Sequence, residues 1–250
     1  VDRRLTHLAE EEQHAAQARS ETTLGLRRGE SLVVTIGIPV GVLLFFGKVS
    51  QPTVNGDPLA FLVPGVLALA VMSSAMVSLG IGTGFDRRFG VLKRLGSTPL
   101  GRPGLLAAKT IYVLVIEVIQ IAVLLAVSIA IGWEPSGGLP LAIAFLALGT
   151  IAFAGLGMLM AGTLRAEANL ALANGLYLVL LFLGGMAYPL TRLPDAVRTF
   201  AELLPAAALA ESVRGALDTH VHVPTHAVVV LVAWAIVLPV LAARLFRWEE

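Results

Sequence analysis

One carboxylic acid, Glu117, stands within an apolar run that covers residues 109–132, and Gln120 follows one helical turn later on the same face. At a rise of 1.5 Å per residue, Glu117 lies about 12 Å along a helix from Lys109. An ionisable group in such surroundings is costly to keep charged, and groups of this kind carry protons in proton-coupled transporters. The sequence assigns no intramembrane basic partner and no second intramembrane carboxylate to accompany Glu117. We therefore favour a hydrogen-bonded structural or pathway role for Glu117, with proton coupling as the alternative.

Hydroxyl and amide side chains interrupt two other apolar runs. On a helix of otherwise apolar residues, such groups hydrogen-bond to neighbouring helices. The residues concerned are Ser73, Ser74 and Ser78 in one run, and Asn174 with Tyr177 in another. Together with Glu117 and Gln120, they are the polar residues that stand out within the apolar runs.

The sequence offers no set of residues for enzymatic chemistry. It contains no Cys, which excludes disulfides, thiolate nucleophiles and cysteine metal sites. The segment "HVHVPTH" supplies His220, His222 and His226, but a metal site needs a further ligand on a rigid frame, so a polar connector is favoured. The nearest approach to a phosphate-binding loop, at residues 41–49, has one residue too many between its glycines and ends in Val49. We expect no catalytic residue, metal or nucleotide in this chain.

The composition is that of a membrane protein. Apolar residues make up 56% of the chain and charged residues 14%, with a mean hydropathy of +0.83, whereas soluble domains are about a quarter charged. The formal net charge of +1 gives no reason to expect nucleic-acid binding. The candidate residues above are therefore expected to be held by membrane-spanning helices.

Six apolar segments have lengths near the ~20 residues that cross a hydrocarbon core. They cover residues 31–47, 59–82, 109–132, 139–164, 169–188 and 227–246. The first is short and contains Pro39, and the fourth and fifth are separated only by "RAEA", which indicates a tight turn. Residues 1–30 are polar and precede the first segment, and we expect them to form a solvated helix that leads into the membrane.

The distribution of basic residues predicts the orientation of these segments. With six crossings, fourteen Lys and Arg fall on the side of both termini and only four on the other side. Six of the fourteen lie between Phe85 and Lys109. Because basic residues are retained in the cytoplasm, we expect both termini and this basic stretch to be cytoplasmic.

The basic stretch begins as an amphipathic helix. On a helical projection, its apolar residues gather on one side and its charged residues on the other, before "GSTP" ends the helix. The apolar set is Phe85, Phe89, Val91, Leu92 and Leu95, and the charged set is Asp86, Arg87, Lys93 and Arg94. The spacing alone fits either a specialised loop or an ordinary positive loop that anchors topology and touches anionic lipid.

A segment of about 38 residues between the last two apolar runs contains two further short helices. Pro194 and Pro205 stand at their starts, where proline is well tolerated. The segment either lies on the opposite membrane surface or dips into it as a re-entrant hairpin.

The stretch "FDRRFGVLKRLGSTPLGRPGLLAAK" (85–109) resembles the loop after the second span in permeases of the type-two ABC exporter family. The matching positions are Asp86, Arg87, Gly90, Leu95, Thr98, Pro99, Leu100 and Lys109. Residues 27–47 resemble the cytoplasmic elbow and first span of that family, and residues 63–71 resemble its second span. Residues 181–217 resemble its fifth span and outer re-entrant segment, with Gly185, Pro189, Pro194, Pro205 and Arg214 in place. The order of these motifs over about 220 residues makes the resemblance specific.

The resemblance implies an all-α membrane protein of six transmembrane helices with three additions. These are an N-terminal cytoplasmic elbow helix within residues 1–30, a cytoplasmic coupling helix in loop 84–108, and an outer re-entrant helical hairpin within residues 189–226 of the 31–250 transmembrane domain. Phe85, Arg87, Arg88, Phe89, Leu92, Lys93 and Arg94 would couple to the ATPase, and Pro189, Pro194, Pro205 and Arg214 would form the outer gate. The polar residues of the second and fifth spans would lie near the translocation path, for which the candidates are Ser73, Ser74, Ser78, Glu117, Gln120, Asn174 and Tyr177.

The function implied is that of a permease subunit of an ATP-driven exporter in the cytoplasmic membrane of a bacterium. A separate ATP-binding cassette subunit would bind ATP and Mg, and a second copy or a related permease would complete the transporter. We expect a hydrophobic or amphipathic cargo, a drug or a lipid, because the spans are apolar with few polar groups. Glycan export by the same family and a proton-coupled secondary transporter that uses Glu117 are the alternatives.

Overall fold

The computed structural model describes residues 37, 39–45, 58–96, 102–134, 138–218 and 222–247. Within these residues the chain is mainly helical and contains no strand. Residues 39–45 are helical. The other helical elements are α3 (Pro58–Val71), η1 (Met72–Ser78), α4 (Leu79–Arg88), α5 (Val91–Gly96), α6 (Arg102–Ala130), α7 (Leu139–Thr163), α8 (Ala166–Leu183), η2 (Leu190–Arg192), α9 (Asp195–Ala201), α10 (Pro205–Leu217) and α11 (Thr225–Leu245).

Five helices of the described residues have the length and apolar composition to cross a membrane. They are Pro58–Arg88, Gly104–Ala130, Leu139–Thr163, Ala166–Leu183 and Thr225–Leu245. These coincide with the second to sixth predicted segments, so the chain is a multi-pass membrane protein. The first predicted segment and the N-terminal elbow lie outside the described residues, except for residues 37 and 39–45.

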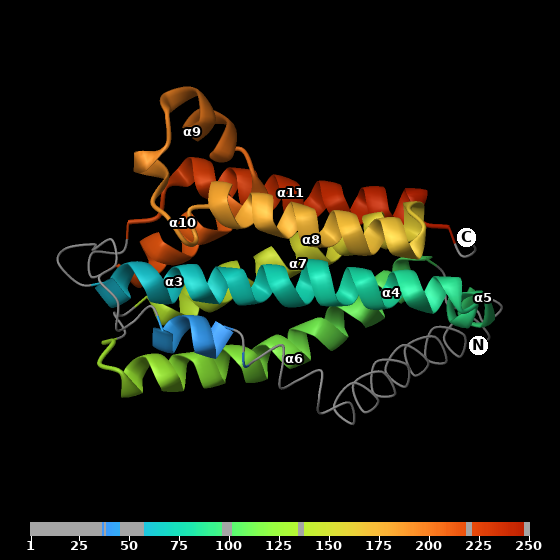
Figure 1. Cartoon of the computed structure of the whole chain (residues 1–250), viewed down its shortest axis with the longest axis horizontal. Coiled ribbons are helices and arrows are strands. Elements are labelled where there is room, and N and C mark those ends of the chain that lie inside the picture. Colours follow the sequence, from blue (N-terminus) through green and yellow to red (C-terminus); the bar gives the residue numbers. More distant parts are fainter. Residues whose placement is uncertain are drawn as a thin grey trace, which may run out of the picture.

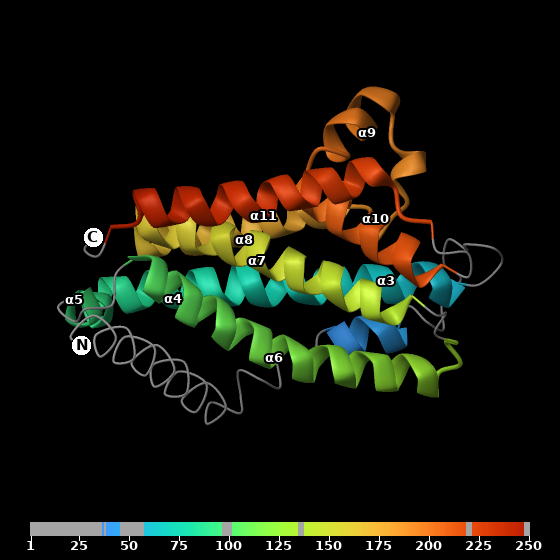
Figure 2. The ribbon, with the colours of Figure 1, turned by 180° about the vertical axis from the view of Figure 1, so that it is seen from behind.

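The helices form three layers. The continuous helix α3–η1–α4 lies in the middle with α7, while α8 and α11 cover one side and α6 covers the other (Figure 1). Figure 2 shows the same order from behind, with residues 39–45 beside α6. The interior is formed by buried aliphatic side chains of α3, η1 and α7, among them Leu67, Met76 and Phe153. The middle layer is therefore enclosed by protein, whereas α8 and α11 keep broad apolar faces exposed.

Glycines set the spacing within the middle layer. A Cβ on Gly157 of α7 would lie 2.8 Å from the carbonyl oxygen of Met76, and one on Gly80 would lie 3.0 Å from the Gly157 Cα. Side chains at these positions would push the two helices apart, because protein interiors leave no such space. The close approach brings η1 against the centre of α7.

The two ends of the bundle differ. At one end, here named the α5 end, α4 passes into α5, and α6, α7, α8 and α11 each begin or end (Figure 1). At the other, the α9 end, Pro194 caps α9 and Pro205 is the first residue of α10, as the sequence predicts. The indole of Trp234 on α11 donates to the Leu203 carbonyl at 2.9 Å, which holds the α9–α10 connection beside α11.

The predicted amphipathic helix at Phe85 is divided in two. The helix α4 ends at Arg88, Gly90 has a φ of 72°, and α5 begins at Val91. A left-handed glycine redirects the chain, so the residues before and after it no longer share one helical face. Phe89 is accordingly 73% exposed, while Leu92 is buried. The prediction that these two side chains lie on one apolar face is wrong.

Candidate functional site

The first candidate site is a set of four buried polar side chains in the middle of the bundle, which we name the intramembrane polar cluster. It consists of Ser74 on η1, Glu117 and Gln120 on α6, and Thr150 on α7. Each of these residues is at most 3% exposed. Three spans therefore direct their polar groups to one point that the rest of the chain shields from solvent.

Hydrogen bonds join the members of the cluster. The Ser74 hydroxyl lies 3.0 Å from Glu117 Oε1 and 3.4 Å from Gln120 Oε1. The Thr150 hydroxyl bonds to Glu117 Oε2. Each hydroxyl also lies near a carbonyl oxygen one turn earlier in its own helix. The Ser74 hydroxyl is 2.7 Å from the Ala70 carbonyl oxygen, and the Thr150 hydroxyl is 2.9 Å from the Leu146 carbonyl oxygen. Glu117 therefore connects α6 to both helices of the middle layer.

Local helix geometry explains why Ser74 reaches Glu117. Ser74 lies in η1, a π-helical stretch from Met72 to Ser78 between the α-helical turns of α3 and α4. A π-helical stretch widens the helix and is often found at functional sites. Sequence reasoning found Ser74, Glu117 and Gln120 but missed Thr150. The available signal was its hydroxyl group within the otherwise apolar run of residues 139–164.

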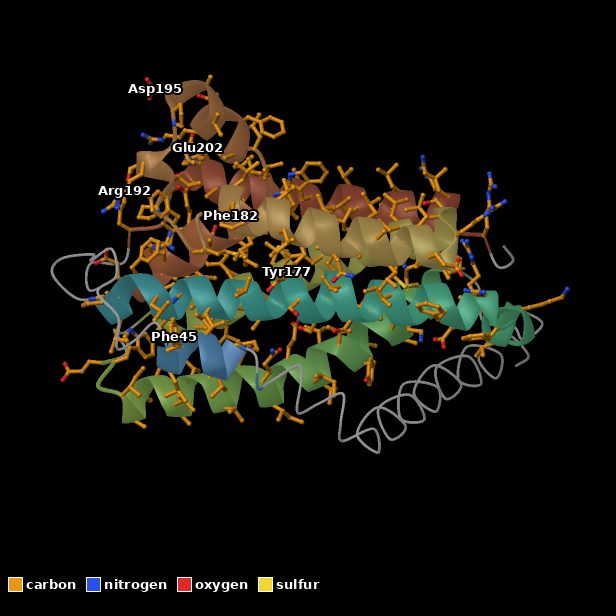
Figure 3. All side chains as sticks on the ribbon, viewed as in Figure 1. Phe45, Tyr177, Phe182, Arg192, Asp195 and Glu202 are labelled. Atoms are coloured by element: carbon orange, nitrogen blue, oxygen red, sulfur yellow. The ribbon has the colours of Figure 1, made fainter. Side chains whose placement is uncertain are left out.

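The remaining predicted path residues lie apart from the cluster. Ser78 is exposed and Ser73 is partly exposed. On α8, Asn174 is exposed and donates to the Leu170 carbonyl at 2.8 Å, and Tyr177 is partly buried against the core. Figure 3 shows Tyr177 where α8 runs beside the middle layer, with Phe182 further along the same helix. The predicted path residues thus divide into one buried set and one surface set.

The second candidate site is at the α5 end, where charged side chains tie helix ends together. Lys109 on α6 pairs with Asp86 on α4 at 3.0 Å, and Arg88 on α4 pairs with Glu167 on α8. Arg87 is buried and donates to the Leu164 carbonyl, where α7 ends. We name these five side chains the helix-end clamp. Arg87 and Arg88, predicted from the sequence to meet another subunit, are thus both engaged within the chain.

Beyond the clamp, Phe89 and Val91 face outward from the turn formed by residues 89–93. Phe89 is 73% and Val91 is 45% exposed, and Lys93 is exposed beside them. Phe85 stacks on Phe89 with ring centroids 6.1 Å apart, and Leu92 anchors the turn inside the protein. The side chain of Arg94 lies outside the described residues. We name residues 89–93 the exposed turn.

At the α9 end, Arg214 holds two segments together. Its Nη2 donates to the Gly185 carbonyl at 2.9 Å, and its guanidinium lies 4.3 Å above the Phe61 ring. Burial lowers the pKa of Arg214 to about 10, partly offset by Glu211, so the side chain keeps its charge at neutral pH. Cation–π contacts of this kind strengthen when they are desolvated. Of the predicted gate residues, Arg214 thus joins α10 to α3, and Pro194 and Pro205 start α9 and α10.

His222 and His226, the two histidines of the α9 end that the structure describes, belong to no group of three or more side chains that could bind a metal. His226 pairs with Glu211 at 3.3 Å, His222 is exposed, and His220 lies outside the described residues. Among the residues that the structure describes, no group of three or more His, Cys, Asp or Glu is placed to hold a metal ion. Pro189, the remaining gate candidate, is partly exposed and precedes η2, and Figure 3 shows Arg192, Asp195 and Glu202 around η2 and α9.

Comparison with known proteins decides the family. Residues 14–217 match the family model of the ABC-2 type transporter membrane domain. The chain belongs to this family. A curated protein of Bacillus subtilis (strain 168), named "Putative transport permease YvfS", is 25% identical over 248 residues, covering 94% of this chain and 97% of that protein. The chain is therefore a membrane transport component of the ABC-2 type, and the resemblance inferred from the loop motif is confirmed.

Proposed function

We propose that this chain is the permease subunit of an ATP-driven exporter that moves a hydrophobic or amphipathic molecule, a drug or a lipid, outward across the bacterial cytoplasmic membrane. ATP and Mg are bound by a separate cassette subunit. Two permease chains, identical or related, form the complete transporter. The 31–250 region supplies six spans in each, including a first span that contains residues 39–45, and residues 1–30 supply the elbow.

The exposed turn carries this proposal. A Phe that is 73% exposed, with a neighbouring exposed Val, is unfavourable in water at the end of a helical bundle. A partner that covers Phe89 and Val91 removes this cost, and Lys93 beside them suits an acidic or polar rim. Because the helix-end clamp ties α4 to α6 and α8, a push on the exposed turn would move three spans together. These are the properties required of a coupling element between an ATPase and a permease.

Charge distribution supports the proposed orientation. The α5 end carries the clamp residues Arg87, Arg88 and Lys109, with Lys93 of α5, Arg165 between α7 and α8, and Arg244 and Arg247 at the end of α11. The α9 end carries Arg192 of η2, Arg198 of α9 and Arg214 of α10. By the positive-inside rule, the α5 end faces the cytoplasm, where a cassette subunit is located, and the α9–α10 hairpin forms the outer gate.

The exposed face of α8 supports an amphipathic cargo. It carries Asn174 and Tyr177 among apolar side chains such as Leu178 and Phe182. One amide and one phenol in an aliphatic surface match a molecule with a small polar group and a large apolar body. A glycan, which presents many hydroxyl groups, would need more polar partners on this surface.

The first test is to purify the tagged chain in mild detergent from its native membrane and to identify co-purifying proteins by mass spectrometry. We expect a cassette ATPase in near-equal amount. The variant Phe89→Ala/Val91→Ala should lose most of this ATPase. The matched control is Phe200→Ala, because Phe200 is 59% exposed on α9 at the opposite end. Recovery of the chain alone, or an ATPase yield that Phe89→Ala/Val91→Ala leaves unchanged, would contradict the proposal.

A further inference from the structure

The contacts within the intramembrane polar cluster require more hydrogen atoms than its two hydroxyl groups supply. The hydroxyl oxygens of Ser74 and Thr150 each make two of these contacts, one with a backbone carbonyl oxygen and one with a carboxyl oxygen of Glu117. The two residues therefore make four such oxygen–oxygen contacts. Each contact needs a hydrogen between the two oxygens, because two oxygens at such distances otherwise repel. A Ser or Thr hydroxyl has only one hydrogen to donate. The two hydroxyls thus supply two of the four hydrogens.

The cluster itself must supply a further hydrogen. If both hydroxyls donate to the Ala70 and Leu146 carbonyls, they present only lone pairs to Glu117. If they donate to Glu117, they present only lone pairs to the carbonyls. Gln120 does not resolve the shortage, because a hydrogen on its amide would lie on the contact between Gln120 and Ser74 and not between Glu117 and either hydroxyl. A protonated carboxyl group on Glu117 adds one donor between Glu117 and a hydroxyl, which reduces the number of contacts without a hydrogen from two to one.

Among the residues that the structure describes, no Lys, Arg or His forms an ion pair with Glu117. The helix α3–η1–α4 contains no charged or His residue from Pro58 to Phe85, and α7 contains none from Leu139 to Thr163. On α11, His226 and Arg244 lie at the two ends, and on α6 the nearest titratable groups are Tyr112 and Lys109. Lys109 is engaged by Asp86. An unpaired carboxylate in the membrane interior is costly, and a neutral carboxylic acid avoids that cost.

We propose that Glu117 is a proton-binding site, protonated in this packed arrangement and emptied when α6 moves away from η1 and α7. In the packed state, the carboxyl O–H donates to Ser74 or Thr150. When the helices separate, water enters, the O–H bond breaks, and the proton passes to water, leaving a hydrated carboxylate. Repacking returns a proton from water to the same oxygen. The protonated state stands on the geometry alone, whereas its exchange during transport rests on the proposed function.

The packing explains why proton exchange requires a movement of helices. All four members of the cluster are shielded from solvent by η1, α6 and α7. A movement of η1, the π-helical stretch that carries Ser74, would break the contact between Ser74 and Glu117. The site therefore binds a proton in one arrangement of the spans and releases it in another.

Infrared spectroscopy of the purified chain in nanodiscs tests the protonated state. We expect a carboxylic acid carbonyl band at neutral pH that shifts down in D₂O, disappears in Glu117→Gln and persists in Glu211→Gln. If Glu117→Gln fails to fold, Thr150→Val serves instead, because loss of a hydrogen-bond partner should shift the band without removing it. Spectra that neither substitution alters would overturn the proposal. A band that is present in choline chloride and lost in sodium chloride would also overturn it, in favour of a sodium site.

The same measurement on the complete transporter tests proton exchange. With the co-purified ATPase trapped by ATP and vanadate, we expect the Glu117 band to weaken and a carboxylate band to grow. An unchanged band in a trapped complex would overturn the exchange step. If no ATPase co-purifies, the proposed function fails, but the spectrum of the chain alone still decides whether Glu117 is protonated.

Discussion

The helix-end clamp and the intramembrane polar cluster both join α6 to the middle layer, with opposite chemistry. In the clamp, Asp86 faces Lys109 at 3.0 Å, and the Asp86 side chain is 38% exposed. In the cluster, Glu117 is 2% exposed and hydrogen-bonds to the hydroxyl groups of Ser74 and Thr150. Two carboxylates 31 positions apart in the sequence are thus used in two ways, one as a charge and one as a hydrogen-bonding group.

The difference follows from access to water. At the end of the bundle, water and ions stabilise charges whether or not they are paired, so an ion pair can break and re-form at small cost. In the membrane interior, a broken contact leaves buried polar groups unsatisfied. Breaking a contact of the clamp should therefore cost less than breaking a contact of the cluster.

The largest effect is expected at the centre of the cluster. Glu117→Ala removes the group that joins α6 to Ser74 and Thr150 and leaves a cavity, which together should cost about 2–4 kcal/mol of unfolding free energy. Glu117→Gln should cost less, because the amide fills the space and keeps polar contacts. Thermal unfolding in detergent measures both. A loss for Glu117→Ala no greater than that for Asp86→Ala would break the contrast between the two regions.

The close approach that supports the cluster is the next to test. Gly157→Ala places a methyl group 2.8 Å from the Met76 carbonyl and should cost about 1–3 kcal/mol by forcing η1 away from α7. Gly82→Ala is the matched control, because no atom lies within 4 Å of a Cβ at that position. Unfolding midpoints of the two variants should differ by several degrees. Equal midpoints would show that α7 and η1 have room to separate without cost.

A smaller effect is expected in the clamp. A double-mutant cycle of Asp86→Ala and Lys109→Ala should give a coupling energy of about 0.5 kcal/mol, because Asp86 is partly solvated. The coupling should fall further in high salt, since ions screen solvated charges. A salt-independent coupling of several kcal/mol would place the clamp with the cluster, as a buried contact.

The smallest effect concerns Glu211 of α10, which lies outside the five candidate spans. Burial raises the pKa of Glu211, although His226 opposes this shift. The folded protein therefore holds this proton more tightly than the unfolded chain. Its contribution to stability is complete below the unfolded pKa and is lost as pH rises through the raised folded pKa. Glu211→Gln should remove that part of the pH dependence of the unfolding midpoint, and parallel curves for the two proteins would contradict the assignment.

Much of the fold could be predicted from composition and spacing. Segments of apolar residues identified five spans to within a few residues, and Pro194 and Pro205 marked the starts of α9 and α10. The site was only partly predictable. Glu117 and Gln120 were identified because a polar residue in an apolar run is unusual, whereas Thr150 was passed over because a single Thr is common in spans.

The sequence by itself determined which segments cross the membrane and to which family the chain belongs, because hydropathy and short motifs are local properties. Tertiary structure alone decided that Thr150 meets Glu117, that Arg87 and Arg88 are engaged within the chain, and that Phe89 faces outward. These outcomes depend on the distance between helices, the π-helical stretch in η1 and the left-handed Gly90. Contacts between residues 33 to 79 positions apart depend on how whole helices pack, and no local pattern encodes that.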